Sequence, residues 1–200
     1  MFHVGNRSIV VLETGVGPDR ARRAVNWFLD QRRQGAPDLV ITAGFAGALS
    51  RTLSIGDIVV ASEVIEPDDI AWRVALPAEL GDLICGRILT WPRMVTTPTE
   101  KKALFDQTKA LAVDMESGSI AETCVARRVP CAVVRAVSDT SEEGLSPELL
   151  RLLDGGQVSL LRVFGRLVRR PRLIGELWRL QRATRRASRN LAEALWRLLD

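Results

Sequence analysis

The sequence contains very few of the side chains on which most hydrolases and metalloenzymes depend. His3 is its single histidine, and tyrosine is absent. One histidine excludes Ser-His-Asp triads, H-E-x-x-H zinc sites and nearly every mechanism that uses a histidine as general base. No G-x-x-x-x-G-K-[ST] motif is present, which argues against a P-loop nucleotidase. Catalysis therefore has to use carboxylates, hydroxyls, arginines and backbone groups, and we expect no metal site.

Cysteines and long apolar runs are also scarce. Cys85, Cys124 and Cys131 are widely spaced and form no C-x-x-C motif, so we expect reduced, buried thiols in a cytoplasmic protein. No apolar run reaches the roughly 18 residues of a membrane-spanning helix, and the first residues lack the pattern of a signal peptide. Apolar residues make up 46% and charged residues 26% of the 200 residues, which are ordinary values for a globular protein with a core.

Charge divides the chain into two parts. Residues 1–160 carry 17 lysines and arginines against 21 acidic residues, whereas residues 161–200 carry 11 arginines against three acidic residues. The net charge of +4 therefore arises at the C-terminal end of the chain. We expect an α/β body over residues 1–145 and a helical, basic extension over residues 146–200.

Strand and helix patterns alternate along the body. Short β-branched runs predict strands, and apolar residues at helical spacing predict helices, one of them beginning at a capping box formed by Thr97 and Glu100. The expected strands are 8–13, 39–42, 55–64, 86–91, 112–113 and 130–137, the expected helices are 18–33, 98–108 and 116–128, and 65–84 is expected to be a loop. This alternation predicts a mostly parallel sheet with flanking helices. Functional residues of such sheets lie beyond the carboxyl ends of the strands, where Gly15, Gly44, Glu116 and Asp139 should gather.

The extension contains helical segments from Ser146 onward, with helices expected over 158–170 and 173–199. Apolar residues form stripes along these helices, and arginines occupy much of the remainder. Two interpretations are open. The stripes pack on the sheet as a helical hairpin, or the helices lie on a membrane surface with Trp178 and Trp196 as interfacial anchors. Binding to nucleic acid is disfavoured, because no aromatic stacking platform accompanies the charge.

Three segments of the body attract attention together. They are Ile41–Leu49 followed by Ile55–Val60, then Ala112–Ser117 (AVDMES), and Val133–Asp139, which contains VRAVSD. Taken singly, each has a structural explanation: a glycine-containing corner, a helix N-terminus favoured by acidic residues, and a capping or Asx turn. In this order and spacing they resemble the nucleoside phosphorylase and nucleosidase superfamily over about residues 8–140.

The resemblance implies a three-layer α/β fold with a twisted mixed sheet. It also implies an enzyme that cleaves the N-glycosidic bond of nucleosides with water or with phosphate. No cofactor is implied, although inorganic phosphate would be a co-substrate of a phosphorylase. Homo-oligomers are expected, since the family commonly builds its sites between subunits.

The resemblance also assigns roles to individual residues. Asp139 matches the acid that protonates the purine N7, with Ser138 supporting it, and an aspartate at this position suits adenine. Glu116 matches the carboxylate that holds the ribose 2′- and 3′-hydroxyls. The other residues expected to contact the substrate are Met115, Asp114, Gly44, Phe45, Ala46, Met94 and Val95, and the candidates for binding an anion are Gly15, Gly17 and Thr42.

The sequence departs from the family pattern in ways that affect its function. Thr42 and Phe45 stand where phosphorylases hold phosphate with an arginine and a serine, and the resemblance begins after the family's first strand. The group that activates the nucleophile is therefore unassigned. Residues 145–171 resemble the hopanoid-associated branch, which is linked with removing adenine from adenosylhopane. We therefore expect a cytoplasmic enzyme acting on an adenosyl-lipid and contacting the inner face of the membrane through residues 161–200.

Two alternatives remain open from the sequence. The first is a soluble nucleosidase acting on 5′-methylthioadenosine or S-adenosylhomocysteine. The second is a homologue that binds a purine without turning it over, which the unmatched first strand favours. Adenine release from small 5′-substituted adenosines would support the first, and binding without turnover would support the second.

Overall fold

The structure is a computed structural model that describes residues 2–5, 7–31, 35–76, 81, 83–144 and 172–199, with side chains of the last segment described from residue 181 onward. The boundary predicted at residue 145 and the helix predicted over 158–170 lie outside the described residues. The helix predicted over 173–199 is present as α6 (Arg172–Leu199).

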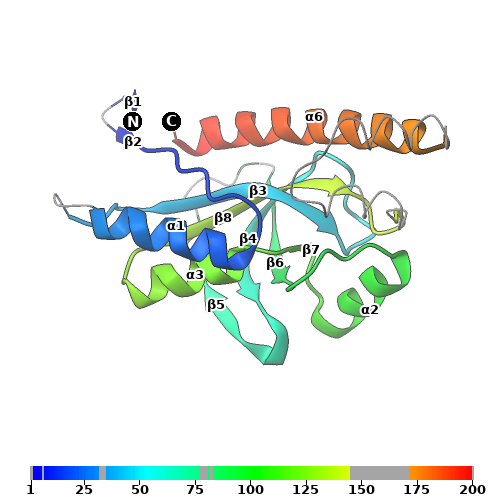
Figure 1. Cartoon of the computed structure of the whole chain (residues 1–200), viewed down its shortest axis with the longest axis horizontal. Helices are drawn as coiled ribbons and strands as arrows, with labels where there is room; N and C mark the ends of the chain where they lie inside the picture. The colour runs from blue at the N-terminus through cyan, green and yellow to red at the C-terminus, as the bar shows by residue number, and fades with distance from the viewer. Residues whose placement is uncertain are drawn as a thin grey trace, which may run out of the picture.

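A six-stranded mixed sheet forms the centre of the molecule, in the order β5-β4-β6-β7-β3-β8. The strands are β3 (Val40–Ala48), β4 (Ile58–Ile65), β5 (Ala71–Arg73), β6 (Ile84–Thr90), β7 (Ala112–Asp114) and β8 (Cys131–Asp139). Because β4 also pairs with β8, the strands β4, β6, β7, β3 and β8 form a closed circuit (Figure 1). The β3–β7, β4–β5 and β4–β8 pairs are antiparallel, so the sheet is mixed rather than mostly parallel.

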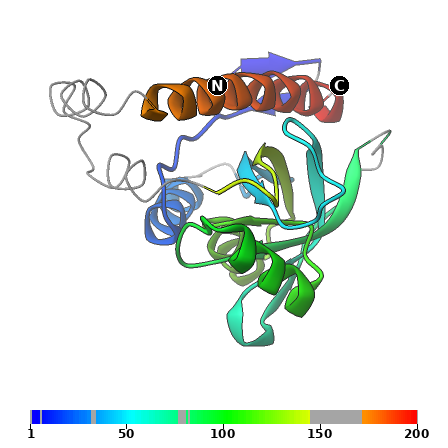
Figure 2. The ribbon, with the colours of Figure 1, turned by 90° about the vertical axis from the view of Figure 1, so that its right-hand side faces the viewer.

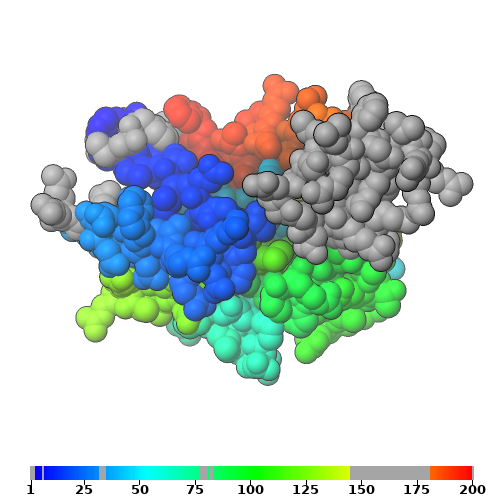
Figure 3. All heavy atoms as spheres, viewed as in Figure 1, coloured from blue at the N-terminus to red at the C-terminus, as the bar shows by residue number. Residues whose placement is uncertain are grey.

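Helices cover the sheet on opposite sides, which gives the three layers that the resemblance implies. Helices α1 (Pro18–Gln31) and α3 (Ser117–Ala126) contact one another, and α2 (Pro98–Thr108) lies near the end of β7. Figures 1 and 2 show α6 on the side of the sheet away from α2 and α3. The space-filling view shows α1 and the segment before it covering the sheet beneath α6 (Figure 3).

Apolar side chains fill both spaces between the layers. The larger cluster lies between the sheet and helices α1 and α3, and includes Val25, Ile120 and Val133. On the other side, Ala187 and Ala194 of α6 pack against Ile58, Val134 and Ala136, together with partly buried leucines of α6. The described side chains of α6 thus cover a sheet face, whereas the apolar stripes predicted within 160–180 lie outside the described side chains.

The N-terminal strand differs from its prediction. The strand predicted over 8–13 is only three residues long, β2 (Arg7–Ile9), and it pairs with β1 (Phe2–Val4) in a hairpin outside the main sheet. Val10 and Val11, which the prediction buried, are 38% and 75% exposed. A β-branched run favours an extended chain, but it does not provide a partner strand, and the partner here is local.

Several smaller predictions also need correction. The glycine-containing segment that was expected as a corner continues as strand to Ala48, and the expected loop 65–84 includes the short edge strand β5. Cys85 is exposed rather than buried, whereas Cys124 and Cys131 are buried free thiols. Among the described helices, none is both long enough and apolar enough to cross a membrane.

Candidate active site

The carboxylate of Asp139 lies at the end of β8, where Ser138 and Lys101 hold its two oxygens. Ser138 Oγ lies 2.6 Å from Asp139 Oδ1 and 3.2 Å from the carbonyl oxygen of Ala46 on the neighbouring strand. Lys101 Nζ donates to Asp139 Oδ2. Gly47 lies directly beside this carboxylate, because a Cβ at residue 47 would come within 3.0 Å of Asp139 Oδ2. The acid predicted from VRAVSD is therefore held in one orientation.

Lys101 contacts the candidate acid and was not among the residues predicted from the sequence. Its ammonium reaches Asp139 from the first turns of α2, and its side chain is 1% exposed. It also donates to the carbonyl oxygens of Thr140 at 2.6 Å and Glu143 at 2.9 Å. Lys101 lies three residues before the buried Leu104, a spacing that places both on the inner face of α2. Because lysines are rarely buried without a partner, and the partner is distant in the sequence, this spacing alone did not identify Lys101.

Glu116 stands at the N-terminus of α3, opposite the loop that precedes α1. The backbone N–H of Gly17 donates to Glu116 Oε1 at 2.7 Å, which brings the N-terminal segment onto this carboxylate. Gly17 has a φ of +104°, a conformation that favours glycine. Gly17 was predicted as an anion-binding residue, and here its N–H binds a carboxylate of the chain itself.

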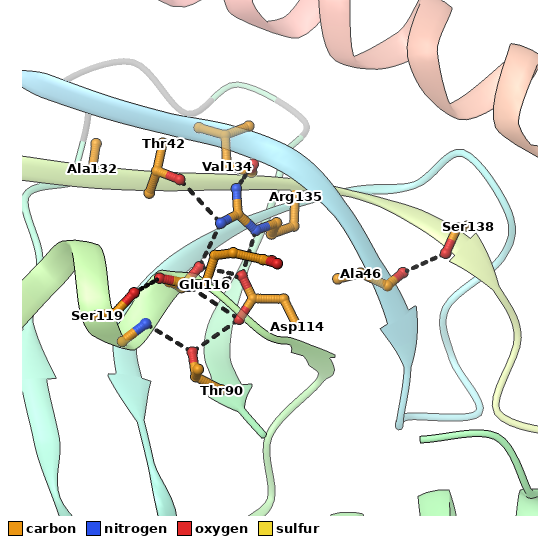
Figure 4. Close-up of polar contacts among 12 residues, drawn as sticks. Thr42, Ala46, Thr90, Asp114, Glu116, Ser119, Ala132, Val134, Arg135 and Ser138 are labelled. Carbon is orange, nitrogen blue, oxygen red and sulfur yellow. Dashed lines mark hydrogen bonds and ion pairs between the residues drawn. The ribbon is translucent and has the colours of Figure 1, made fainter. Parts of the chain in front are cut away.

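A buried ion network lies behind Glu116 (Figure 4). Arg135 Nε donates to Asp114 Oδ2 at 2.7 Å, and Arg135 Nη2 donates to the hydroxyls of Thr42 at 3.0 Å and Ser117 at 2.8 Å. Thr90 Oγ1 donates to the second oxygen of Asp114 at 2.8 Å. The Arg135 and Asp114 side chains are 3% and 1% exposed. We infer that Asp114 and Thr42, predicted to contact substrate or an anion, hold the segment that carries Glu116.

Strand register brings the two candidate catalytic carboxylates to the same end of the sheet. Gly47 of β3 pairs with Asp139 on one side and with Val113 on the other, three residues before Glu116. Two strand spacings separate Val113 from Asp139, about 10 Å between backbones. Gly44 lies three residues before Gly47 in β3, and a Cβ there would come 3.3 Å from Arg135 Nη1. The two glycines therefore make room for the side chains of Arg135 and Asp139.

The remaining predicted contact residues divide into exposed and buried groups. Phe45 and Met94 are 41% and 45% exposed, and Met115 is partly buried, so each is open to a ligand. Ala46 and Val95 are buried in the apolar core. Gly15 is exposed in the loop before α1.

Metal ligands find no support in the described part of the chain, and the Cys131 thiol is not a reactive group. No group of three or more His, Cys, Asp or Glu side chains there could hold a metal ion. A hydrogen bond with Cys124 and burial raise the pKa of Cys131 far above its ordinary range, so this thiol stays protonated. The polar groups available for chemistry are therefore those around Asp139 and Glu116.

Comparison with known proteins places the chain in a family. The family model of the phosphorylase superfamily matches residues 1–79 and 74–152. The 5′-methylthioadenosine/S-adenosylhomocysteine nucleosidase of Haemophilus ducreyi is 29% identical over 172 residues, covering 70% of this chain and 71% of that protein. The enzyme of the same name from Staphylococcus epidermidis is 27% identical over 190 residues, covering 79% and 81%.

Solved structures agree with this assignment at the level of the fold. A 5′-methylthioadenosine/S-adenosylhomocysteine nucleosidase from Helicobacter pylori superposes with a TM-score of 0.57 at 23% identity, covering 65% of this chain and 66% of that one. Futalosine hydrolase from the same organism gives a TM-score of 0.58 at 24% identity, with 65% and 66% covered. The expected twisted mixed sheet with flanking helices is thus confirmed, and the chain belongs to the phosphorylase superfamily.

Proposed function

We propose that the protein cleaves the N-glycosidic bond of an adenine nucleoside. The observation that carries the proposal is the pair of differently held carboxylates at one end of the sheet. Asp139 is fixed by Ser138 and Lys101, and Glu116 is held by the Gly17 N–H. The relatives from H. ducreyi and S. epidermidis, which are nucleosidases by name, support the same reaction.

The two carboxylates suit the two requirements of this bond cleavage. A purine leaves more easily when its N7 accepts a proton or a strong hydrogen bond, which Asp139 supplies as general acid. The ribose develops positive charge as the base departs, and a carboxylate on its 2′- and 3′-hydroxyls orients the sugar and stabilises that charge. Glu116 fills this second role, while the buried Arg135–Asp114 pair keeps the start of α3 in place.

Water is the nucleophile that the observations favour. The relatives are named nucleosidases rather than phosphorylases. The hydroxyl of Thr42, predicted as an anion ligand, is buried and bonded to Arg135. We therefore propose hydrolysis of a small 5′-substituted adenosine, such as 5′-methylthioadenosine, as the activity best supported.

A lipid-linked adenosine is a second candidate substrate, favoured by one feature of the site region. Phe45 and Met94 expose much of their apolar surface, although large apolar side chains gain about 1.5–3 kcal/mol from full burial. They would line the mouth of a site that accepts an apolar 5′-substituent. Adenosylhopane is such a substrate, and a peripheral contact between α6 and a membrane would bring the enzyme to it.

The test is adenine release, followed by chromatography, from 5′-methylthioadenosine and from adenosylhopane, each with and without phosphate. Release without phosphate supports hydrolysis, and a preference between the two substrates identifies the 5′-substituent. Asp139→Asn should lower turnover about 10²–10⁴-fold, because asparagine cannot transfer a proton. Asp106→Asn is the matched control, since Asp106 is an exposed aspartate of α2 that pairs with Lys102.

Two outcomes would contradict the proposal. Near-normal turnover of Asp139→Asn would remove Asp139 from the role of acid. Purine binding without adenine release from either substrate by the wild-type protein would instead support a non-catalytic homologue.

A further inference from the structure

We propose that Lys101 is a positioning residue for the acid Asp139, and that it acts on the departure of the base rather than on substrate binding. This inference rests on the proposed function, because it concerns the same acid. It adds a group from α2, an element that none of the family-like motifs of this sequence includes.

The first argument is the complete use of the buried ammonium. A lysine ammonium has three N–H donors, and Lys101 directs one to each of three acceptors: Asp139 Oδ2, the Thr140 carbonyl and the Glu143 carbonyl. With 1% of the residue exposed, water does not replace any of them. Burying a cation is costly unless it is paired and hydrogen-bonded. The three acceptors around Lys101 therefore meet the requirements of a buried ammonium group.

The second argument is what the contact does to Asp139. Ser138 lies at hydrogen-bond distance from Asp139 Oδ1, and Lys101 donates to Oδ2. The backbone at Gly47 lies so close to the carboxylate that a Cβ there would come within 3.0 Å of Oδ2. A carboxylate at a strand end would otherwise rotate about two side-chain bonds. The same ammonium ties the turn at residues 140–143 to α2, so the acid, its strand end and the following turn are fixed together.

The third argument separates this role from ordinary support of the fold. Lys101 contacts the acid and backbone carbonyls, so its loss should leave ribose binding at Glu116 intact. An effect that acts through the acid should also disappear once Asp139 is replaced, which a general loss of packing would not do.

The experiment compares Lys101→Met, Lys101→Arg and Lys102→Met with the wild type on 5′-methylthioadenosine. Lys102 is the next residue of α2 and is exposed, so Lys102→Met removes the same charge from the same helix without touching Asp139. We expect kcat of Lys101→Met to fall about 10–100-fold, as when a catalytic group is misplaced by about 1 Å, with KM within about twofold. Lys101→Arg, which keeps the positive charge, should recover part of the lost rate.

A double-variant cycle decides whether Lys101 acts through Asp139. In the Asp139→Asn background, Lys101→Met should cause little further loss, because the acid on which it acts is already absent. This background also removes the partly buried carboxylate that would be left without its cation in the single variant, so the comparison remains measurable if Lys101→Met alone fails to fold.

Each contrary result identifies what has failed. Unchanged kcat in Lys101→Met, or a full further loss in the Asp139→Asn background, would overturn the role of Lys101 while leaving the proposed function in place. A wild-type protein that binds the nucleoside but releases no adenine would overturn the proposed function, and the role of Lys101 with it.

Discussion

Arg135 and Asp114 form a buried ion pair whose loss should destabilise the protein. Replacing one partner leaves the other as an uncompensated charge in the core, which typically costs about 3–5 kcal/mol. Arg135→Met should therefore lower the free energy of unfolding by about that amount, measured by urea denaturation. Thr42 and Ser117 would also lose the hydrogen bonds that Arg135 donates to their hydroxyls.

The matched control for this prediction is an exposed pair. Arg87 and Glu63 lie 2.9 Å apart, but their side chains are 52% and 29% exposed. Arg87→Met should cost less than about 1 kcal/mol, because solvent screens such pairs. Combining Arg135→Met with Asp114→Leu should recover much of the lost stability, since neither charge is then buried alone. Equal costs for Arg87→Met and Arg135→Met would contradict this account of the network.

At this scale, motifs identified charged residues better than their partners. Asp139, Ser138 and Glu116 were selected from short segments that resemble a family. Lys101 was missed because its partner lies 38 residues away in the sequence, at a distance fixed only by the fold. Asp114 was predicted to contact the substrate together with Glu116, yet its carboxylate points into the buried network. Strand β7 ends at Asp114 and Glu116 lies beyond it, so the alternation of a strand does not fix the direction of Glu116 relative to Asp114.

Among the elements, those with strong local preferences were predicted best. The helices expected over 18–33 and 98–108 begin at Pro18 and Pro98 as expected, and Thr97 accepts a hydrogen bond from the Glu100 N–H. The strand expected over 55–64 is present as β4 after a turn at Gly56. Sheet order was not predictable, because β4–β8 and β3–β7 pair strands that are distant in the chain. Local patterns set the type of an element, whereas its partners depend on the whole fold.

Helix α6 shows how the apolar pattern of the extension was only partly interpreted. The prediction relied on large apolar residues and tryptophans, but the buried residues of α6 among the described side chains, 181–199, are Ala183, Ala187 and Ala194. Their spacing of four and seven residues places them on one helix face. Alanines let the helix approach the sheet closely, where Asn190 Nδ2 donates to the Gly56 carbonyl at 2.8 Å. Alanines repeated at helical spacing therefore form the contact surface of this helix. The larger apolar residues of the same helix make this surface hard to identify from the sequence.

A substitution in α6 tests this contact. Ala187 is fully buried against the sheet, whereas Ala192 is exposed on the same helix. Ala187→Asp should lower the free energy of unfolding by several kcal/mol, because it places an unpaired charge in the core. Ala192→Asp should stay within about 0.5 kcal/mol of the wild type, as surface substitutions usually do. Thermal and urea unfolding of both variants measure the difference, and similar stabilities would show that α6 does not need its contact with the sheet.

At the scale of the whole molecule, positive charge is concentrated on α6, the helix that covers one face of the sheet. Arg182, Arg185 and Arg189 are exposed on α6, at positions opposite the buried alanines, and Trp196 on the same face is 58% exposed. Figures 1 and 2 show this helix along an outer side of the molecule. At about 1.5 Å per residue, its 28 residues extend about 42 Å. Over residues 181–199 the apolar face of α6 is occupied by the sheet, so we expect a membrane contact of this part to be mainly electrostatic.

This separation predicts binding to anionic vesicles that depends on three arginines. Each basic residue near an anionic membrane contributes about 1 kcal/mol, so Arg182→Gln/Arg185→Gln/Arg189→Gln should weaken binding about 100-fold. The triple variant Arg22→Gln/Arg51→Gln/Arg127→Gln removes the same charge from the body instead of α6 and should bind like the wild type. Co-sedimentation with phosphatidylserine-containing and phosphatidylcholine vesicles measures the effect, which should weaken as salt rises. Equal binding to neutral vesicles, or equal loss in both triple variants, would reject α6 as the contact and leave its arginines as a solvated face.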